Sequence, residues 1–287
     1  MITLAKKEVM SEEEFRLLRD LIHNEFGILL KGDKRLTLHT KVSHRLSILG
    51  LSTYQQYYEY IMADSSKEEL YTFVSHITNN DTYFFREKTQ LDVFAELLVD
   101  IKQEKQQKYD KKLRIASLAS SSGEEAYTLN IIVQESKLFI WGWDMKIIGI
   151  DVNRNAIQKA NEACYTKNSF RLINDNSTAY IDKYFANEKG RYFLRKSSAK
   201  NVEFKLGNLL DRKTFEGLHP LDVIFCRNFL IYMSDEAILK LVKNFYDALS
   251  DTGHLFIGSS ESLIQKTNLF VPEYQRSIIV YRKNLKV

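Results

Sequence analysis

Cysteine and proline are both scarce in this chain, with two residues of each among 287. The two cysteines, Cys164 and Cys226, stand at no spacing typical of a zinc site. The sequence therefore predicts neither a metal centre nor a disulfide scaffold, and we expect a reducing compartment, the cytoplasm. So few prolines, together with only eleven glycines, favour long helices joined by few loops.

Long apolar runs and a strong net charge are also missing. No stretch approaches the ~20 apolar residues of a membrane-spanning helix, and the first residues lack the pattern of a signal peptide. The formal net charge is only +4, which by itself is too weak to argue for nucleic-acid binding. Hydrophobic residues at 44% and charged residues at 27% are ordinary values for a globular protein.

The first ~105 residues carry only helical patterns. Ser11 and Glu14 form a capping box, and apolar residues follow at helical spacing. We expect four further helices, over 38–49, 54–62, 70–77 and 91–101, with 102–112 as an exposed loop or frayed helix end. The second helix has a basic face, which consists of Lys34, Arg35, Lys41, His44 and Arg45.

From Leu113 onward, short apolar runs alternate with helical patterns. Such alternation predicts βαβ units and a mostly parallel sheet. Because no helix follows the last apolar run, 277–283, we expect that strand to enter antiparallel at or near a sheet edge. The alternation breaks between 164 and 201, where a turn at Lys189–Gly190 predicts a small insertion containing a β-hairpin.

Polar residues follow the predicted strands, at the edge where open α/β sheets bind ligands. A small-residue turn after the first strand leads to Glu124 and Glu125 at a helix start, which suits an ammonium or ribose group better than a phosphate. Asp151 ends the second strand, where an acid suits ribose hydroxyls. Asn208 and Asn228 follow two later strands and offer amide groups for an adenine edge or an amino-acid headgroup. Together these residues indicate S-adenosylmethionine.

Each of these residues also has a purely structural interpretation. Asp151 suits a helix N-cap, Glu125 a helix cap, and Asn228 a turn. The segment 78–86 runs from polar residues through Phe84 and Phe85 to Arg86, and its two phenylalanines suit a core. That interpretation leaves the arginine unexplained.

Several segments, in chain order, carry a family resemblance. NDTYFFR at 80–86 is similar to N-E-T-x-F-F-R, and RIASLASSSGEEAY at 114–127 to R-I-W-S-A-G-C-S-S-G-E-E-P-Y. The match continues through GID at 149–151, NLL at 208–210, FCRN at 225–228 with LIY at 230–232, and LFIG at 255–258 with Ser260 and Glu261. The sequence resembles the CheR-type chemotaxis receptor methyltransferases over about residues 10–282.

The resemblance implies an α/β fold: a Rossmann-like S-adenosylmethionine-dependent methyltransferase domain with a small inserted β-subdomain, preceded by an all-helical domain. We expect a helical receptor-docking domain at 1–78, a linker plus methyltransferase domain at 79–287, and the insertion at 165–204. Asp81, Ala119, Ser120 and Ala126 depart from the family's motifs, but none of these changes removes a charged site residue.

The resemblance also implies roles for individual residues. Arg86 and Tyr232 would be catalytic, with Arg86 orienting the acceptor carboxylate and Tyr232 near the reacting methyl group. Glu125 would bind the amino group of the cofactor's methionine part and Asp151 its ribose. The remaining cofactor-binding residues would be Asn80, Thr82, Arg86, Asn208, Leu209, Asn228 and Phe229.

The implied reaction is methyl transfer from S-adenosylmethionine to glutamate side chains on the cytoplasmic helical bundle of chemotaxis receptors. Lys41, His44 and Arg45 would dock on that acidic bundle, although a basic helix face is also often merely solvated. We expect a monomer that neither binds nucleic acid nor inserts into a membrane. Two alternatives stay open: a methyltransferase that acts on another acceptor, and a non-catalytic module that senses S-adenosylmethionine or binds receptors.

Overall fold

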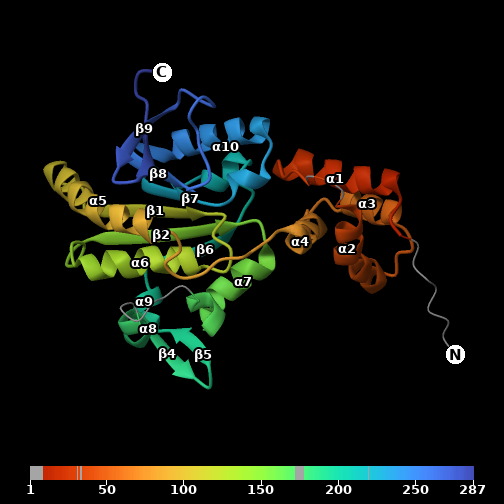
Figure 1. Ribbon diagram of the computed structural model, residues 1–287, viewed down its shortest axis with the longest axis horizontal. Coiled ribbons are helices and arrows are strands. Elements are labelled where there is room, and N and C mark those ends of the chain that lie inside the picture. Colours follow the sequence, from red (N-terminus) through yellow and green to blue (C-terminus); the bar gives the residue numbers. More distant parts are fainter. Residues whose placement is uncertain (1–8, 31, 33, 172–177, 219) are drawn as a thin grey trace.

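The computed structural model describes residues 9–30, 32, 34–171, 178–218 and 220–287. A lobe of helices stands beside a larger lobe built on a sheet, and a small unit containing β4 and β5 extends from the larger lobe (Figure 1). The helical lobe contains α1 (Glu12–Phe26), α2 (Arg35–Leu49), α3 (Tyr54–Ala63) and α4 (Glu68–Ile77). None of the helices in these ranges has the length and apolarity needed to cross a bilayer.

Local sequence signals account for the ends of α1 and α3. The hydroxyl of Ser11 accepts from the backbone N–H of Glu14, whose carboxylate accepts from the backbone N–H of Ser11. Thr53 and Gln56 form the same reciprocal pair at the start of α3. Gly27 ends α1 in the left-handed region, at φ 69°. The predicted helices are therefore confirmed with small shifts in their ends.

A seven-stranded sheet with strand order β6-β2-β1-β7-β8-β10-β9 forms the centre of the larger lobe. The strands from β6 to β8 are parallel, whereas β10 runs antiparallel to both of its neighbours. This confirms the mostly parallel sheet and the antiparallel last strand. The strands are β1 (Lys112–Leu118), β2 (Asp144–Asp151), β6 (Val202–Leu206), β7 (Leu221–Cys226), β8 (Leu249–Ile257), β9 (Phe270–Gln275) and β10 (Ile278–Lys283).

Helices cover both faces of this sheet because successive strand residues point to opposite sides. Ile115 of β1 packs with Phe94 and Leu129 from α5 (Lys88–Gln107) and α6 (Glu124–Ser136). The next residue, Ala116, packs in the cluster that holds Leu241 of α10 (Asp235–Ala248). The helix α7 (Arg154–Glu162) follows β2.

The region from 164 to 201 is a compact unit with more elements than the sequence predicts. The predicted hairpin is confirmed as β4 (Phe185–Glu188) and β5 (Arg191–Leu194), with Lys189 and Gly190 in the turn. The strand β3 (Cys164–Thr166) pairs with β5 and completes a three-stranded sheet. The unit also contains η1 (Lys167–Phe170), α8 (Thr178–Tyr184) and α9 (Lys196–Ala199).

Two expectations need correction. Of the two alternatives for 102–112, an exposed loop or a frayed helix end, the loop is wrong for 102–107. These residues continue α5, because Ile101 is buried and the helix carries an ion pair between Lys108 and Glu104 one turn apart. The edge strand β9 was not predicted. It contains Pro272, which is compatible with a sheet edge but weakens the strand signal.

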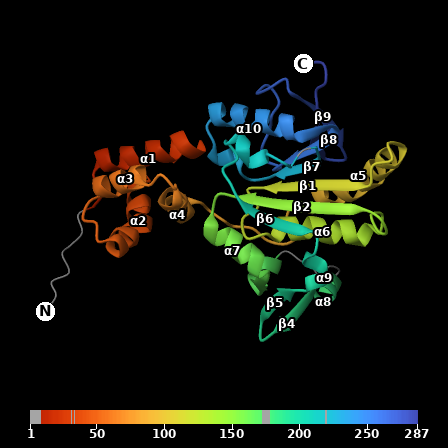
Figure 2. The same cartoon turned by 180° about the vertical axis from the view of Figure 1, so that it is seen from behind.

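The two lobes are held together by hydrogen bonds on both sides of their junction, between backbone groups on one side and from the side chain of Asn153 on the other. Residues 27–29 pair with 232–234: the N–H of Leu29 donates to the carbonyl of Tyr232 at 2.8 Å, and that of Ser234 to Gly27 at 3.1 Å. On the other side, the amide of Asn153 donates to the carbonyl of Ser75, where α4 lies beside α7 (Figure 2). These contacts fix the helical lobe against the carboxyl edge of the sheet.

Candidate functional site

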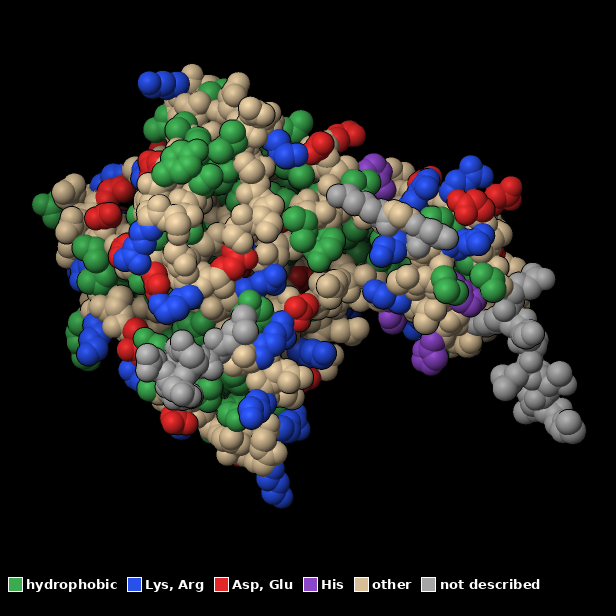
Figure 3. Space-filling model, viewed as in Figure 1, with side chains coloured by type: hydrophobic (Ala, Val, Ile, Leu, Met, Phe, Trp, Pro, Cys, Tyr) green, Lys and Arg blue, Asp and Glu red, His purple; other side chains and the backbone are tan. Residues whose placement is uncertain are grey.

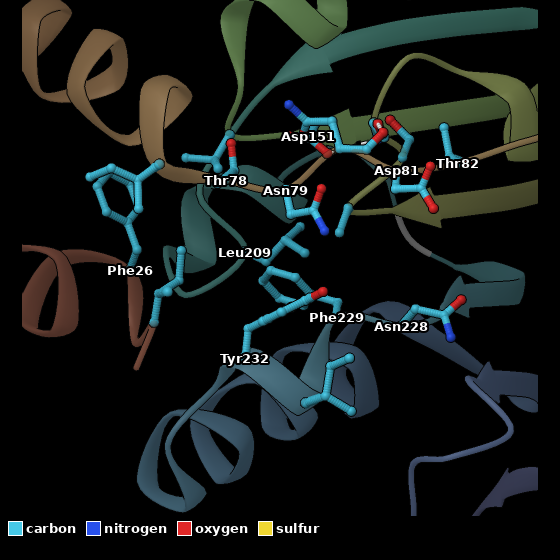
Figure 4. Close-up of a pocket in the computed structure, with 18 of the residues that line it drawn as sticks. Phe26, Thr78, Asn79, Asp81, Thr82, Asp151, Leu209, Asn228, Phe229 and Tyr232 are labelled. Atoms are coloured by element: carbon cyan, nitrogen blue, oxygen red, sulfur yellow. Dashed lines mark hydrogen bonds between the residues drawn. The ribbon is translucent and has the colours of Figure 1, made fainter. Parts of the chain in front are cut away.

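A cleft of about 440 Å³ lies between the two lobes, at the carboxyl ends of β1, β2 and β7. The strand β1 has β2 on one side and β7 on the other, so the cleft lies at the topological switch point of the sheet. Phe26 and Thr78 reach it from the helical lobe, with Asp151 above and Phe229 and Tyr232 below (Figure 4). In the space-filling view, the lobes meet along a hollowed junction with charged side chains nearby (Figure 3).

The loop after β1 makes a tight turn at the floor of the cleft. Ala119 and Ser121 have positive φ angles of 56° and 50°, and Gly123 has a φ of 92° at the start of α6. Left-handed non-glycine residues carry a conformational cost and concentrate at functional sites. The hydroxyl of Ser120 is buried and makes no hydrogen bond within the described residues.

Asp151 lies at the end of β2, and its carboxylate accepts two backbone hydrogen bonds. The N–H groups of Ser121 and Asn153 each donate to it at 2.8 Å. Burial raises the pKa of Asp151, and these backbone donors oppose the rise. The N-cap interpretation of Asp151 is wrong, because Asn153 caps α7. The carboxylate instead ties the loops after β1 and β2 together beside the cleft.

Glu125 and Arg227, which both line the cleft, form an ion pair. The Nε of Arg227 donates to the carboxylate of Glu125 at 2.7 Å, and the hydroxyl of Ser117 donates to its other oxygen at 2.7 Å. The side chain of Arg227 is only 2% exposed and that of Glu125 is 13% exposed. Arg227 also donates to the carbonyl of Arg86 at 2.9 Å. One buried guanidinium therefore links α6, the end of β7 and the segment that carries Arg86.

The segment 80–87 crosses from the helical lobe into the sheet lobe along the cleft. The carbonyl of Asn80 accepts from the hydroxyl of Ser121, and the N–H of Phe85 donates to Thr128. Phe84 is fully buried, as its core interpretation predicts. Arg86 is half-buried and lines the cleft together with Asn80 and Thr82.

The loop after β7 is shaped by two acidic residues, Glu87 and Glu261. Asn228 has a φ of 57°, and its side-chain amide donates to Glu87 at 3.0 Å. The carboxylate of Glu261 accepts from the N–H groups of Gly258, Asn228 and Ile231. Burial raises the pKa of Glu261, with backbone donors opposing. The constrained loop presents Phe229 and Tyr232 to the cleft.

Asn208 lines the cleft, but its side chain is used for a contact between the lobes. Its amide donates to the carbonyl of Glu25 at 2.7 Å, and its oxygen accepts from the N–H of Leu210. Leu209 follows it as an apolar wall residue.

The structure brings the predicted catalytic and cofactor-binding residues to this one cleft. Of the predicted docking residues, Lys41 also lines it and donates to the carbonyl of Ile77 at 3.0 Å. His44 is exposed on α2. Arg45 instead points inward, where its guanidinium donates twice to Glu69, a residue that is 5% exposed and also accepts from Tyr57.

Sequence reasoning missed three residues that organise the cleft: Arg227, Glu87 and Glu261. Arg227 had a usable signal, because it is a charged residue directly after the apolar run 221–226. Glu261 stands in the last motif of the family resemblance and could have been singled out there, whereas Glu87 carries no comparable signal because its partners come from distant segments. Within the described ranges, no three His, Cys, Asp or Glu residues gather as metal ligands.

Comparison with known families decides the class of protein. Residues 80–278 match the model for the CheR methyltransferase SAM-binding domain, and residues 13–78 match the CheR methyltransferase all-alpha domain. The chain belongs to the CheR methyltransferase family. It is a methyltransferase with S-adenosylmethionine as its cofactor, as predicted, and the predicted fold class is confirmed.

Curated relatives of the CheR chain agree along nearly its whole length. It is 31% identical to chemotaxis protein methyltransferase 2 of Vibrio cholerae, over 96% of this chain and 94% of the relative. It is 28% identical to the chemotaxis protein methyltransferase of Borreliella burgdorferi, over 91% of this chain and 92% of that relative. It is 27% identical to that of Escherichia coli, over 91% and 88%.

The residues of this CheR cleft fit S-adenosylmethionine. A buried carboxylate, Asp151, stands where a ribose would need acceptors, and Leu209 and Phe229 supply apolar surface for a ring. The unpartnered hydroxyl of Ser120 offers a polar group at the floor. Glu125 adds negative charge suited to an ammonium group.

Proposed function

We propose that this CheR-family protein methylates the side-chain carboxylates of glutamates on chemotaxis receptors, as a protein-glutamate O-methyltransferase. The product would be a glutamate methyl ester together with S-adenosylhomocysteine. One observation carries the proposal: Arg86 and Tyr232, which suit an acceptor carboxylate, line the same cleft as Asp151 and Glu125, which suit the cofactor. The names of the curated relatives support a receptor as the acceptor.

Within this proposal, the cofactor is held from three sides. Asp151 would bind the ribose, while Glu125, held by Arg227, would bind the amino group of the methionine part. Backbone and side-chain groups of Asn80 and Thr82 would border the methionine part. The adenine would lie against a wall made by Asn208, Leu209, Asn228 and Phe229.

A glutamate acceptor needs no general base, because a carboxyl group of reference pKa about 4.3 is already ionised at neutral pH. The remaining task is to hold the carboxylate in line with the transferable methyl group and away from water. The guanidinium of Arg86 can orient a carboxylate through paired N–H donors. The Tyr232 hydroxyl is available at the cleft mouth, where the side chain is 40% exposed.

We infer that the partner is the cytoplasmic helical bundle of the receptor, so that this protein acts in the cytoplasm. We also infer that it acts as a monomer. Lys41 and His44 are both exposed on α2, where Lys41 offers a positive charge to such an acidic surface. We also infer three units: a docking domain at 1–78, a linker and methyltransferase domain at 79–287, and an inserted unit. The two family matches, which meet at residues 78 and 80, support this division. The predicted bounds of the insertion, 165–204, need a small correction, because its first strand starts at Cys164 and residues 202–204 belong to β6 of the main sheet.

The decisive experiment transfers tritiated methyl from S-adenosylmethionine to purified receptor membranes, with wild type beside Arg86→Ala. We expect a label that base releases as methanol, which is typical of a carboxyl ester, and its loss in the variant. Calorimetry with S-adenosylhomocysteine is run on both proteins. Binding without any transfer to receptors would overturn the receptor assignment and favour another acceptor or a sensing role.

A further inference from the structure

The ring of Tyr83 lies close to two guanidinium groups, those of Arg171 and Arg86. The guanidinium carbon of Arg171 stands 4.5 Å from the centre of the tyrosine ring, and that of Arg86 stands 5.6 Å from it. Both distances fall within the range of cation–π attraction. Arg86 is the proposed acceptor-orienting residue, whereas Arg171 belongs to the inserted three-stranded unit, directly after η1.

Asp81 joins the same two arginines by a second route. An Nη of Arg171 donates to both carboxylate oxygens of Asp81, at 2.7 and 2.8 Å. The backbone carbonyl of Asp81 accepts from an Nη of Arg86 at 3.1 Å. Arg171 therefore holds both the aromatic ring and the residue whose carbonyl fixes the Arg86 side chain.

The inserted unit also anchors the backbone between these residues. The N–H of Phe84 donates to the carbonyl of Ser169 at 2.8 Å. The Phe84 ring stacks on Phe170, with centroids 4.9 Å apart and an interplanar angle of 6°, and packs edge-on against Phe185. The main chain of 81–86 is thus held rigidly by this unit, which leaves the long side chain of Arg86 as the part that still needs orientation.

We propose that Arg171 is a positioning residue for methyl transfer, acting on the Arg86 side chain through Asp81 and Tyr83. This inference rests on the proposed function and deepens it, because it gives the inserted unit a part in the reaction. Arg86 has no carboxylate partner within the described residues, so the donors not used by the carbonyl of Asp81 are available for an acceptor once the direction of the side chain is set. Arg171 sets the direction of the Arg86 side chain without itself touching the reacting groups.

The proposal predicts a specific kinetic pattern. In Arg171→Gln, kcat for receptor methylation falls about 5- to 20-fold, since small losses of orientation are costly in a displacement reaction. The affinity for S-adenosylhomocysteine changes by less than about 2-fold, because Asp151 and Glu125 keep their partners. Arg171→Lys keeps the charge but loses the planar fork, so kcat recovers only in part.

Arg191 offers a matched control in the same unit. It lies on the hairpin strand β5 near Phe193, and no described contact joins it to 81–86. Arg191→Gln removes the same charge from the unit, so it reports any general attraction for an acidic receptor. We expect Arg191→Gln to leave kcat unchanged and to raise at most the receptor KM.

A double-mutant cycle that combines Arg171→Gln with Asp81→Asn tests the coupling between Arg171 and Asp81. If Arg171 acts through Asp81, the double variant loses little more kcat than either single variant. Losses that simply multiply, or an equal effect of Arg171→Gln and Arg191→Gln, would overturn the inference while leaving the proposed function intact. Absence of base-labile transfer by the wild type would instead remove the proposed function. Thermal unfolding of each variant separates a folding defect from a loss of kcat.

Discussion

The Nε of Arg227 lies 2.7 Å from a carboxylate oxygen of Glu125, in a buried ion pair at the floor of the cleft. Burying charge is costly, so such a pair requires close geometry and additional hydrogen bonds. Ser117 supplies one to Glu125, and the carbonyl of Arg86 accepts one from Arg227. We therefore expect the pair to hold the carboxylate of Glu125 in place for a cationic ligand group.

The first prediction concerns Arg227→Lys, which retains the charge and loses the fork of donors. The affinity for S-adenosylhomocysteine should fall about 10-fold, the loss expected for one charge-assisted hydrogen bond. Isothermal titration calorimetry gives the dissociation constant. Arg45→Gln is the control, because it breaks a partly buried ion pair away from the cleft. Unchanged affinity in Arg227→Lys would show that Glu125 needs no such support.

A second prediction separates two possible uses of Asn208. Its amide donates to the carbonyl of Glu25, so Asn208→Asp would place a carboxylate against that carbonyl. We expect the free energy of unfolding to fall by about 1–2 kcal/mol, because a partly buried contact between the lobes is lost. Urea unfolding measures this with and without S-adenosylhomocysteine. A loss of ligand affinity at unchanged stability would instead favour direct contact with the cofactor.

The third prediction concerns the proposed docking face of α2. Lys41→Gln and His44→Gln should raise the receptor KM, with an effect that fades as salt increases. Arg45→Gln should chiefly lower stability, by about 2–3 kcal/mol, because Glu69 loses its charged partner while buried. Receptor methylation across a salt series, with parallel thermal unfolding, distinguishes the two outcomes. If Arg45→Gln raised the receptor KM and left stability unchanged, the assignment of Arg45 to an inward-pointing ion pair with Glu69 would be contradicted.

A fourth prediction concerns pH. Burial, and next Arg282 at 3.1 Å, lower the pKa of His254 from 6.5 to about 4, while Glu104 opposes the shift. Between pH 4 and pH 6.5, the imidazole of His254 therefore binds a proton in the unfolded chain but not in the folded protein. The contribution of His254 to the free energy of unfolding is therefore fully present above pH 6.5 and is lost as the pH falls towards 4. The free energy of unfolding falls by about 3 kcal/mol when this contribution is fully lost.

His254→Gln should flatten this part of the acid dependence of the free energy of unfolding. Urea titrations across the same pH range provide the measurement. His44→Gln, at an exposed site, serves as the control and should leave the slope unchanged. An equally steep slope in His254→Gln would assign the acid sensitivity to other groups.

Much of the fold follows from local sequence signals. The capping residues Ser11 and Thr53 fix two helix starts through contacts three residues away. The apolar runs 113–119 and 221–226 form strands because they are buried on both faces of the sheet. By contrast, β9 forms only where β10 provides a partner, and its proline weakens any local signal.

Polar residues that follow the strands can be read from the sequence alone, and parallel strands necessarily bring those residues to one edge. Asp151, Glu125 and Asn228 could be assigned to one cleft for this reason, whereas Tyr232 came from the family resemblance. The partners of these residues could not be read in the same way, because they are set by tertiary packing. Arg227 meets Glu125 and Arg45 turns to Glu69 across 102 and 24 residues, respectively, so their geometry depends on how whole helices and strands pack. A charged residue shows its type in the sequence, but whether it faces solvent, a ligand or another charge depends on the neighbours that folding brings to it.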